Sequence, residues 1–390
     1  MKKSLLAVAA MTAFAGAAQA QSSVTVYGIM DVGYTNGSAS FTSATATNKQ
    51  NVSRISNSME SGSRIGFRGT EDLGGGTSAN FVYELGIQPA GNAGSNASGE
   101  TIAAPTASSG SNAGSPNQVF NTRQAYVGLV KKGLVDVRIG TQNTFNWEQA
   151  GSNTTGQLNQ TLGSMLAPTT DGAFFNSASV PSTATAALNG SAYGAFTNRT
   201  TNTITARSDR MAGVQAKLGA VLSNQDSTRT SATNGGNSNQ FGWMGALDWN
   251  IQKANIQASY QVFHSEAPVG GAATYTTTPA AWGSGTQGNN VIDGQALITG
   301  SYDFGILKAY AGWVNRKVQA DNNPSLFLKR SAQEIGVRSF ITPTIEGWAS
   351  VGNGRYTSYG VGAPTANIIG YQLGGNYWLS KRTNLYTIYG

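Results

Sequence analysis

The chain has 390 residues, of which 50 are glycine, none is cysteine and only 11% are charged, with a formal net charge of +7. Ordinary soluble domains carry about 25% charged residues, so this composition is unusual for a soluble domain. After the N-terminus no stretch offers 18 consecutive apolar residues, which excludes a helical membrane protein. The cations are scattered, with no run longer than Lys131-Lys132, so nucleic-acid binding is not supported.

Residues 1–20 have the layout of a secretory signal peptide. Lys2 and Lys3 precede an apolar run that extends to about Ala18, and Ala18-Gln19-Ala20 forms an A-x-A cleavage site. The sequence therefore predicts an exported chain beginning at Gln21. Removing the two lysines lowers the net charge from +7 to +5.

The rest of the chain shows strand-like alternation in runs of about ten residues. Ile256 and Tyr260 fall on one face of the 255–264 segment, and Gln257 and Gln261 fall on the other. The segments 214–223 and 369–380 alternate in the same way. Such runs are typical of transmembrane β-strands, which need about 9–11 residues. Soluble sandwiches have shorter strands, but alternation alone does not separate the two classes.

The lengths of the connections between strands distinguish a transmembrane barrel from a soluble sandwich. Short links alternate along the chain with long polar ones; the long ones cover residues 35–52, 89–120, 145–198, 224–239, 267–290, 320–327 and 358–366. Short turns at one end and long loops at the other are the layout of an outer-membrane barrel. We count fourteen full strands and a fifteenth at 383–390. Because bacterial barrels have an even number of strands, we expect an all-β, transmembrane antiparallel β-barrel of 16 strands in the full-length protein, with its last strand missing here. The alternative is a complete 14-stranded barrel with a short tail.

The longest connection that carries anchors is 145–198. It is rich in Ser, Thr, Asn, Gly and Ala, and it also holds apolar side chains that a solvated linker would not need: Trp147, Leu158, Leu162, Met165, Leu166, Phe174 and Phe175. Long loops in compact domains are usually functional or disordered. We predict that this loop folds back into the mouth of the barrel and narrows it.

Four segments resemble the general diffusion porins of Gram-negative bacteria, most of all the β-proteobacterial family. They are VTVYGIMD (24–31), SRIGFRGTEDLGGG (63–76), TRQAYVGL (122–129) and YWLSKRTNLY (377–386). The resemblance implies a homotrimer of 16-stranded barrels in the outer membrane, each with its third external loop folded inward. It also implies passive flow of ions and small hydrophilic solutes. The Pro-Glu-Phe-Gly-Gly motif of many enteric porins does not occur in 145–198, so the resemblance does not fix which loop residues line the narrowest point.

Pore selectivity arises from charged side chains at a constriction. Alternation places Arg64 opposite Ile65 and Phe67, and an Arg at mid-bilayer depth on the lipid face would cost about 2–4 kcal/mol. Arg64 is therefore expected to face the lumen. By resemblance, Arg64, Arg123 and Arg199 form the basic wall that faces the inward loop.

Carboxylates on the loop would face this wall and create a transverse field; the candidates are Glu148 and Asp171. Four further charged residues are expected to line the lumen as secondary polar groups: Arg68, Asp31, Glu84 and Lys308. The net charge of the mature chain predicts a weak preference for anions. The alternative is that the arginines are structural and form salt bridges between strands.

No reacting group is apparent. His264 is the only histidine, so no His-based triad or metal cluster can be assembled, and we predict no catalytic residue, cofactor or metal. Two further functions remain open. A substrate-specific porin would guide a sugar or organic acid along aromatic side chains such as Trp147, Phe174 and Phe175, whereas a non-conducting barrel would serve as an adhesin or anchor. The expected partners are other copies of the chain, outer-membrane lipid and lipopolysaccharide, and small solutes and ions.

Overall fold

The computed structural model describes residues 23–42, 47–57, 59–87, 89, 120–159, 161, 163–166, 199–225, 234–235, 238–267, 269–270, 289–320, 324–325, 327–358, 363 and 365–390. The predicted signal peptide and Asp171 lie outside these ranges. Within them, no helix is long and apolar enough to cross a membrane.

Antiparallel strands make up nearly all of the described chain. Their bounds are β1 Ser23–Ile29, β2 Val32–Thr42, β3 Thr47–Asn57, β4 Arg64–Gly74, β5 Thr77–Ile87, β6 Phe120–Lys131, β7 Val135–Asn143, β8 Arg199–Ser208, β9 Val214–Gln225, β10 Asn234–Gly235, β11 Ser238–Ile251, β12 Ala254–Ala267, β13 Val269–Gly270, β14 Asn289–Asp303, β15 Lys308–Ala320, β16 Phe327–Thr342, β17 Ile345–Ser358, β18 Thr365–Trp378 and β19 Asn384–Tyr389. One described helix, α2 (Phe145–Ser152), follows β7.

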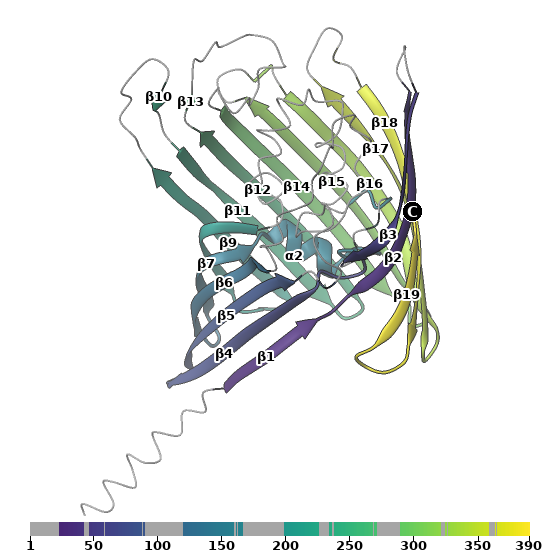
Figure 1. Cartoon of the computed structure of the whole chain (residues 1–390). Helices are drawn as coiled ribbons and strands as arrows, with labels where there is room; N and C mark the ends of the chain where they lie inside the picture. The colour runs from purple at the N-terminus through teal and green to yellow at the C-terminus, as the bar shows by residue number, and fades with distance from the viewer. Residues whose placement is uncertain are drawn as a thin grey trace, which may run out of the picture.

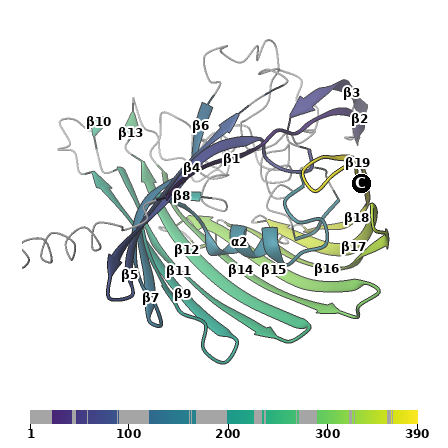
Figure 2. The same ribbon diagram turned by 90° about the horizontal axis from the view of Figure 1, so that it is seen from below.

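Fifteen of these strands form one sheet in the order β1-β4-β5-β6-β7-β8-β9-β11-β12-β14-β15-β16-β17-β18-β19. The sheet curls into a barrel wall that surrounds α2 (Figures 1 and 2). In this sheet the shortest links lie at one end, as predicted; β11 and β12, for example, are separated by the two residues 252–253. The expected long connection 35–52 is wrong in one respect: most of it belongs to β2 and β3, which pair with each other in a separate two-stranded sheet. The all-β barrel is confirmed, and the expectation of a sixteenth strand stays a prediction.

The sheet is inverted relative to a soluble protein, with polar side chains buried inside and apolar ones exposed outside. In β18, Gln372 is fully buried, whereas Ile369 is 80% exposed. In β12, Gln261 is buried on the inner face and Ile256 is exposed on the outer face. Alternation of this kind is what a wall between lipid and an aqueous lumen requires.

Side chains connect the two edges of the sheet near the chain termini. The break between β1 and β2 presents Asp31, whose Oδ2 accepts from the backbone N–H groups of Glu60 (2.8 Å) and Ser61 (2.7 Å). The hydroxyl of Tyr386 on β19 donates to Asp31 Oδ1 at 2.6 Å. Asn384 Nδ2 donates to Glu60 Oε2 at 2.8 Å. Asp31, which lies between β1 and β2, therefore links the segment before β4 to β19.

The described start of the 145–198 loop lies inside the barrel, as predicted. The helix α2 begins after Thr144, whose Oγ1 accepts from the backbone N–H of Trp147 at 3.2 Å. The predicted anchors Met165 and Leu166 are buried against Leu297 of β14 and Val314 of β15. Burying side chains of this size contributes about 1.5–3 kcal/mol each, which fixes the loop to the wall. The anchors Leu162, Phe174 and Phe175 lie outside the described residues.

Candidate functional site

The first cluster of charges on the inner wall combines two of the predicted arginines with a carboxylate. Arg123 Nε on β6 donates to Glu84 Oε1 on β5 at 2.7 Å, and both side chains are buried. Arg64 Nη1 on β4 lies 3.9 Å from the same oxygen. The Tyr27 hydroxyl donates to Glu84 Oε2 at 3.1 Å. Because β4, β5 and β6 are adjacent strands, inward residues at matching registers meet, and Glu84 neutralises part of the basic wall.

Arg199, the third predicted arginine, has a different environment. Its guanidinium lies over the ring of Trp147 on α2, with 5.2 Å between Cζ and the ring centroid, a cation–π contact. Its Nε and Nη2 are buried and have no hydrogen-bond acceptor among the described residues. Arg199 therefore presents a desolvated positive charge that no described carboxylate pairs.

The three arginines border one internal cavity of about 620 Å³. Loop residues such as Trp147 and Leu158 form one side of the cavity. The other side is formed by strands near the two edges of the sheet, including β1 and β4 at one edge and β18 and β19 at the other. Eight charged residues line the cavity among those described, namely the cations Arg64, Arg123, Arg199, Arg338, Lys381 and Arg382 and the carboxylates Glu60 and Glu346. The cavity is thus strongly cationic.

The wall across the cavity contributes an ion pair that the sequence reasoning missed. Arg338 on β16 contacts Glu346 on β17 at 2.5 Å and 3.0 Å. Its Nη1 also donates to the backbone carbonyl of Thr155 in the loop at 3.2 Å. Arg338 therefore fixes the loop to the wall, and its charge is balanced by Glu346 within the same cavity.

Glu148, predicted as an acidic constriction residue, makes its ion pairs with another part of the wall. Its carboxylate accepts from Arg207 on β8 at 2.7 and 2.9 Å and from Lys217 on β9 at 3.2 Å. Burial would raise the pKa of Glu148, but these two cations outweigh it and hold that pKa below its ordinary value. The sequence reasoning did not assign Arg207 and Lys217, although both occupy the polar face of an alternating strand.

Polar side chains fix the loop along its whole described length. Gln149 Nε2 donates to Thr299 Oγ1 at 3.0 Å, and its Oε1 accepts from Ser259 at 2.6 Å. Further along, the buried Glu334 on β16 accepts from the hydroxyl of Ser164 and the backbone N–H of Met165. The loop is thus bound to β12, β14 and β16 by buried hydrogen bonds.

Among the secondary lumen residues, Glu84 contacts Arg64 and Arg123 directly. Asp31 is linked to Arg64 through Ser61, whose backbone N–H donates to Asp31 and whose Oγ accepts from Arg64 Nη2 at 2.8 Å. Arg68 contacts the ring of Tyr27 (5.4 Å), and Lys308 contacts the ring of Tyr310 (5.1 Å). Asp31 serves the link between the sheet edges.

A barrel with this inward loop and charged lumen has counterparts among known proteins. The family model described as "Gram-negative porin" matches residues 7–390. The chain belongs to the Gram-negative porin family. A curated relative, an outer membrane porin protein of Bordetella pertussis, is 49% identical over 94 residues, which are 22% of this chain and 24% of the relative. The chain thus matches about a quarter of that relative's length.

Solved structures share the fold of this porin at low sequence identity. An anion-selective porin from Comamonas acidovorans superimposes with a TM-score of 0.56 at 22% identity, covering 94% of this chain and 87% of the other. The trimer form of OmpT from Vibrio cholerae gives a TM-score of 0.56 at 11% identity, with the same coverage of 94% and 87%. These similarities concern the barrel fold.

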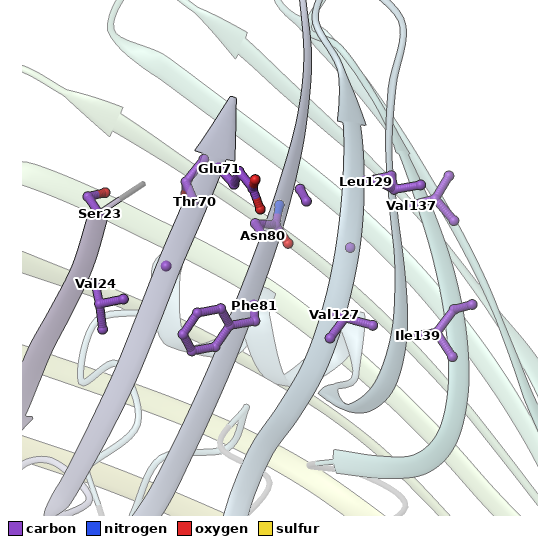
Figure 3. Close-up of a pocket in the computed structure, with 13 residues that line it drawn as sticks. Ser23, Val24, Thr70, Glu71, Asn80, Phe81, Val127, Leu129, Val137 and Ile139 are labelled. Atoms are coloured by element: carbon purple, nitrogen blue, oxygen red, sulfur yellow. The ribbon is translucent and has the colours of Figure 1, made fainter. Parts of the chain in front are cut away.

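The outer surface of this porin has one apolar groove of about 500 Å³ on β1, β4, β5, β6 and β7 (Figure 3). Val24, Phe81, Val127 and Ile139 line it. Gly69 lies beneath the Phe81 ring, and a Cβ at this position would clash with that ring. The groove therefore depends on a residue without a side chain.

Proposed function

We propose that this porin forms a water-filled channel for the passive diffusion of ions and small hydrophilic solutes across the outer membrane, with a preference for anions, and that it does not act as an enzyme. The observation that carries the proposal is the internal cavity, whose described lining holds six cations and two carboxylates. A narrow passage with low-dielectric walls concentrates counter-ions of the opposite sign. The Comamonas acidovorans protein, a porin of the same fold that is described as anion-selective, supports the same direction.

Arg64, Arg123 and Arg199 are proposed as the basic side of the constriction. Glu84 cancels part of the charge of Arg123, whereas Arg199 keeps its full charge beside Trp147. We therefore assign Arg199 the largest share of the anion preference.

Glu148 and Asp171 are proposed as the acidic side, with unequal roles. Because Glu148 is bound to Arg207 and Lys217, its charge is compensated locally, and its main effect is to hold α2 against β8 and β9. Asp171 lies outside the described residues, and its part in the transverse field stays a prediction.

We also propose that the channel works as a homotrimer. The apolar groove beside Val24 and Val127 is a surface that a neighbouring protomer can cover, and the Vibrio cholerae structure of the same fold is described as a trimer.

Conductance of the purified protein in a planar lipid bilayer tests the channel directly. We expect stepwise currents that rise in proportion to salt concentration, with insertion events in groups of three. Currents that saturate with one solute would instead favour a substrate-specific pore. The absence of current from a folded, inserted barrel would contradict the proposal and favour an adhesin or anchor.

A further inference from the structure

The first two crossings of the barrel, β1 followed by β2 and β3 followed by β4, are interrupted at the same level. The residue pairs that border the interruption are Ile29 with Arg64 and Val32 with Asn57. Between these pairs one crossing has residues 30–31, whereas the other has residues 58–63. Surplus residues on one side of a strand pair bulge out of the ladder. The longer side of this interruption must therefore leave the plane of the wall.

The surplus residues point into the lumen. Glu60, Ser61 and Gly62 line the internal cavity of about 620 Å³, together with loop residues such as Trp147 and Leu158. We call residues 59–63 the inner bend. The cavity is thus bordered by two segments that lie outside the strand ladder, the inner bend and the 145–198 loop.

A buried carboxylate holds the inner bend in place. Asp31 is 7% exposed, and its Oδ2 accepts from the backbone N–H groups of Glu60 and Ser61. Its Oδ1 accepts from the Tyr386 hydroxyl at 2.6 Å. At the end of the bend, Ser63 Oγ accepts from the backbone N–H of Asp31 at 2.9 Å and donates to its carbonyl at 3.0 Å. Hydrogen bonds to an ionised group are roughly twice as strong as neutral ones, so Asp31 fixes the bend along its length.

The inner bend in turn positions two arginines of the basic wall. Ser61 Oγ accepts from Arg64 Nη2 at 2.8 Å. Gly62 lies against Arg123, because a Cβ at position 62 would be 2.8 Å from Arg123 Nη1. A displacement of the bend would therefore move both cations. In this way the Tyr386 hydroxyl on β19 acts on the arginines of β4 and β6 through Asp31 and the bend.

A second series of hydrogen bonds connects the bend with the far side of the cavity. Asn384 Nδ2 donates to Glu60 Oε2 at 2.8 Å and to Asn376 Oδ1 at 3.3 Å. Asn376 Nδ2 donates to Glu346 Oε2 at 3.0 Å. Glu346 is the partner of Arg338, which donates to the loop backbone. The inner bend and the loop therefore belong to one hydrogen-bonded border around the cavity.

We propose that the inner bend is a second constriction element of the channel, with Ser61 in the narrow passage, and that Asp31 and Tyr386 are positioning residues that hold it there. This inference rests on the proposed function, because a constriction element requires that ions cross the cavity. Ions then pass between the inner bend and the loop, and the arginines that the bend holds face them at fixed positions.

Cysteine labelling tests the place of the bend, because the chain has no cysteine of its own. Ser61→Cys puts a thiol on the bend. Ser78→Cys is the matched control, since Ser78 shares the inner face of β5 with Glu84 but lies opposite Asp72, near a short turn and outside the cavity lining. Each variant is labelled with a negatively charged sulfonate methanethiosulfonate and, separately, with a positively charged trimethylammonium one. Mass spectrometry measures the extent of labelling, and a planar bilayer under a KCl gradient measures conductance and selectivity.

Both adducts of Ser61→Cys should lower the single-channel conductance. The negative adduct should lower the anion-to-cation permeability ratio about three- to fourfold and the positive adduct should raise it equally, as expected for one unit charge about 6 Å from the ion path. The adducts of Ser78→Cys should change the ratio less than about twofold, because the charge is farther from the ions and more screened. Equal effects at the two positions would overturn the inference, as would failure of both reagents to label Ser61→Cys in the folded protein.

Tyr386→Phe tests the positioning role, because it removes one hydroxyl and no charge. Tyr389→Phe makes the same change on the exposed face of the same strand. In labelled Ser61→Cys protein, Tyr386→Phe should reduce the adduct effect on the ratio from about three- to fourfold toward about twofold, since a released bend lets the charge move away from the ion path. Tyr389→Phe should leave the adduct effect unchanged. Equal adduct effects in the two backgrounds would overturn the positioning role.

The unmodified protein separates this inference from the channel proposal. Anion-preferring currents that labelling of Ser61→Cys leaves unchanged would overturn the inner bend as a constriction element and leave the channel proposal standing. The absence of current from the unmodified, folded protein would overturn both.

Discussion

Replacing Arg199 with alanine should weaken the anion preference of the channel more than any other single change in the basic wall. Arg199 lies over Trp147 and has two buried nitrogen donors without a described acceptor. Arg123, by contrast, shares its charge with Glu84 at 2.7 Å. Removal of Arg199 therefore removes a full positive charge from the cavity lining.

The size of the effect follows from Coulomb's law. A unit charge about 6 Å from a passing ion contributes about 0.7 kcal/mol in a water-like dielectric. Screening at about 0.1 M salt, with a Debye length of about 10 Å, roughly halves this energy. Since about 1.4 kcal/mol corresponds to a tenfold change in an equilibrium constant, the loss of this charge should lower the anion permeability about twofold and raise the cation permeability about twofold. The anion-to-cation permeability ratio should fall about three- to fourfold.

The assay is the reversal potential in a planar bilayer under a KCl gradient. Arg199→Lys keeps the charge without the planar guanidinium, so it should retain most of the selectivity. Lys253→Ala removes one charge from an exposed short turn and should leave the ratio unchanged. An unchanged ratio in Arg199→Ala, or an equal fall in Lys253→Ala, would refute the assignment of selectivity to the cavity.

Three further predictions concern the loop, the wall and the outer surface. Glu148→Gln should loosen α2 and increase open-channel current noise at neutral pH, since the lost charge-assisted bonds contribute about 2–3 kcal/mol. The unmodified channel should show the same noise only in acid. The reason is that the pKa of Glu148 is lowered, so its ion pairs are intact at every pH above the ordinary carboxyl pKa of about 4.3 and are lost as the pH falls through the folded-state pKa. Glu84→Gln leaves Arg123 without its anionic partner, so it should raise the anion preference while lowering the thermal unfolding midpoint, with a destabilisation of about 3–5 kcal/mol; an unchanged midpoint would show that the pair is not structural. Gly69→Val would displace the Phe81 ring and alter the groove, so it should reduce the trimer fraction on native gels without abolishing the folded monomer; a full trimer yield would exclude this face as the interface.

The barrel wall could be predicted from the sequence because its signal is local. A period of two places Gln257 and Gln261 on the inner face and Ile256 on the outer face, independently of the neighbouring strands. In the structure Gln261 is buried, Ile256 is exposed, and the Gln257 side chain accepts from Ser152 of the inward loop. Because short turns alternate with long connections along the chain, the sequence also indicates at which end of the barrel each strand begins and ends. Both features depend only on residues close together in the chain.

The partners of the site residues depend on contacts that the sequence does not display. Glu84 lies between Arg64 and Arg123 because the register of β4, β5 and β6 brings them together. Glu148 meets Arg207 and Lys217 only because α2 begins at Phe145. The N-cap Thr144 is followed three residues later by Trp147 in place of the Glu or Gln of a capping box, so the signal for this helix was weak.

The sign of the reversal potential of the unmodified protein tests the central claim most directly. The claim is that the 145–198 loop and a cationic wall confine ion flow to one positively charged passage. We predict an open channel whose reversal potential under a KCl gradient lies toward the chloride equilibrium value. A reversal potential on the potassium side, from a folded and conducting protein, would contradict the claim.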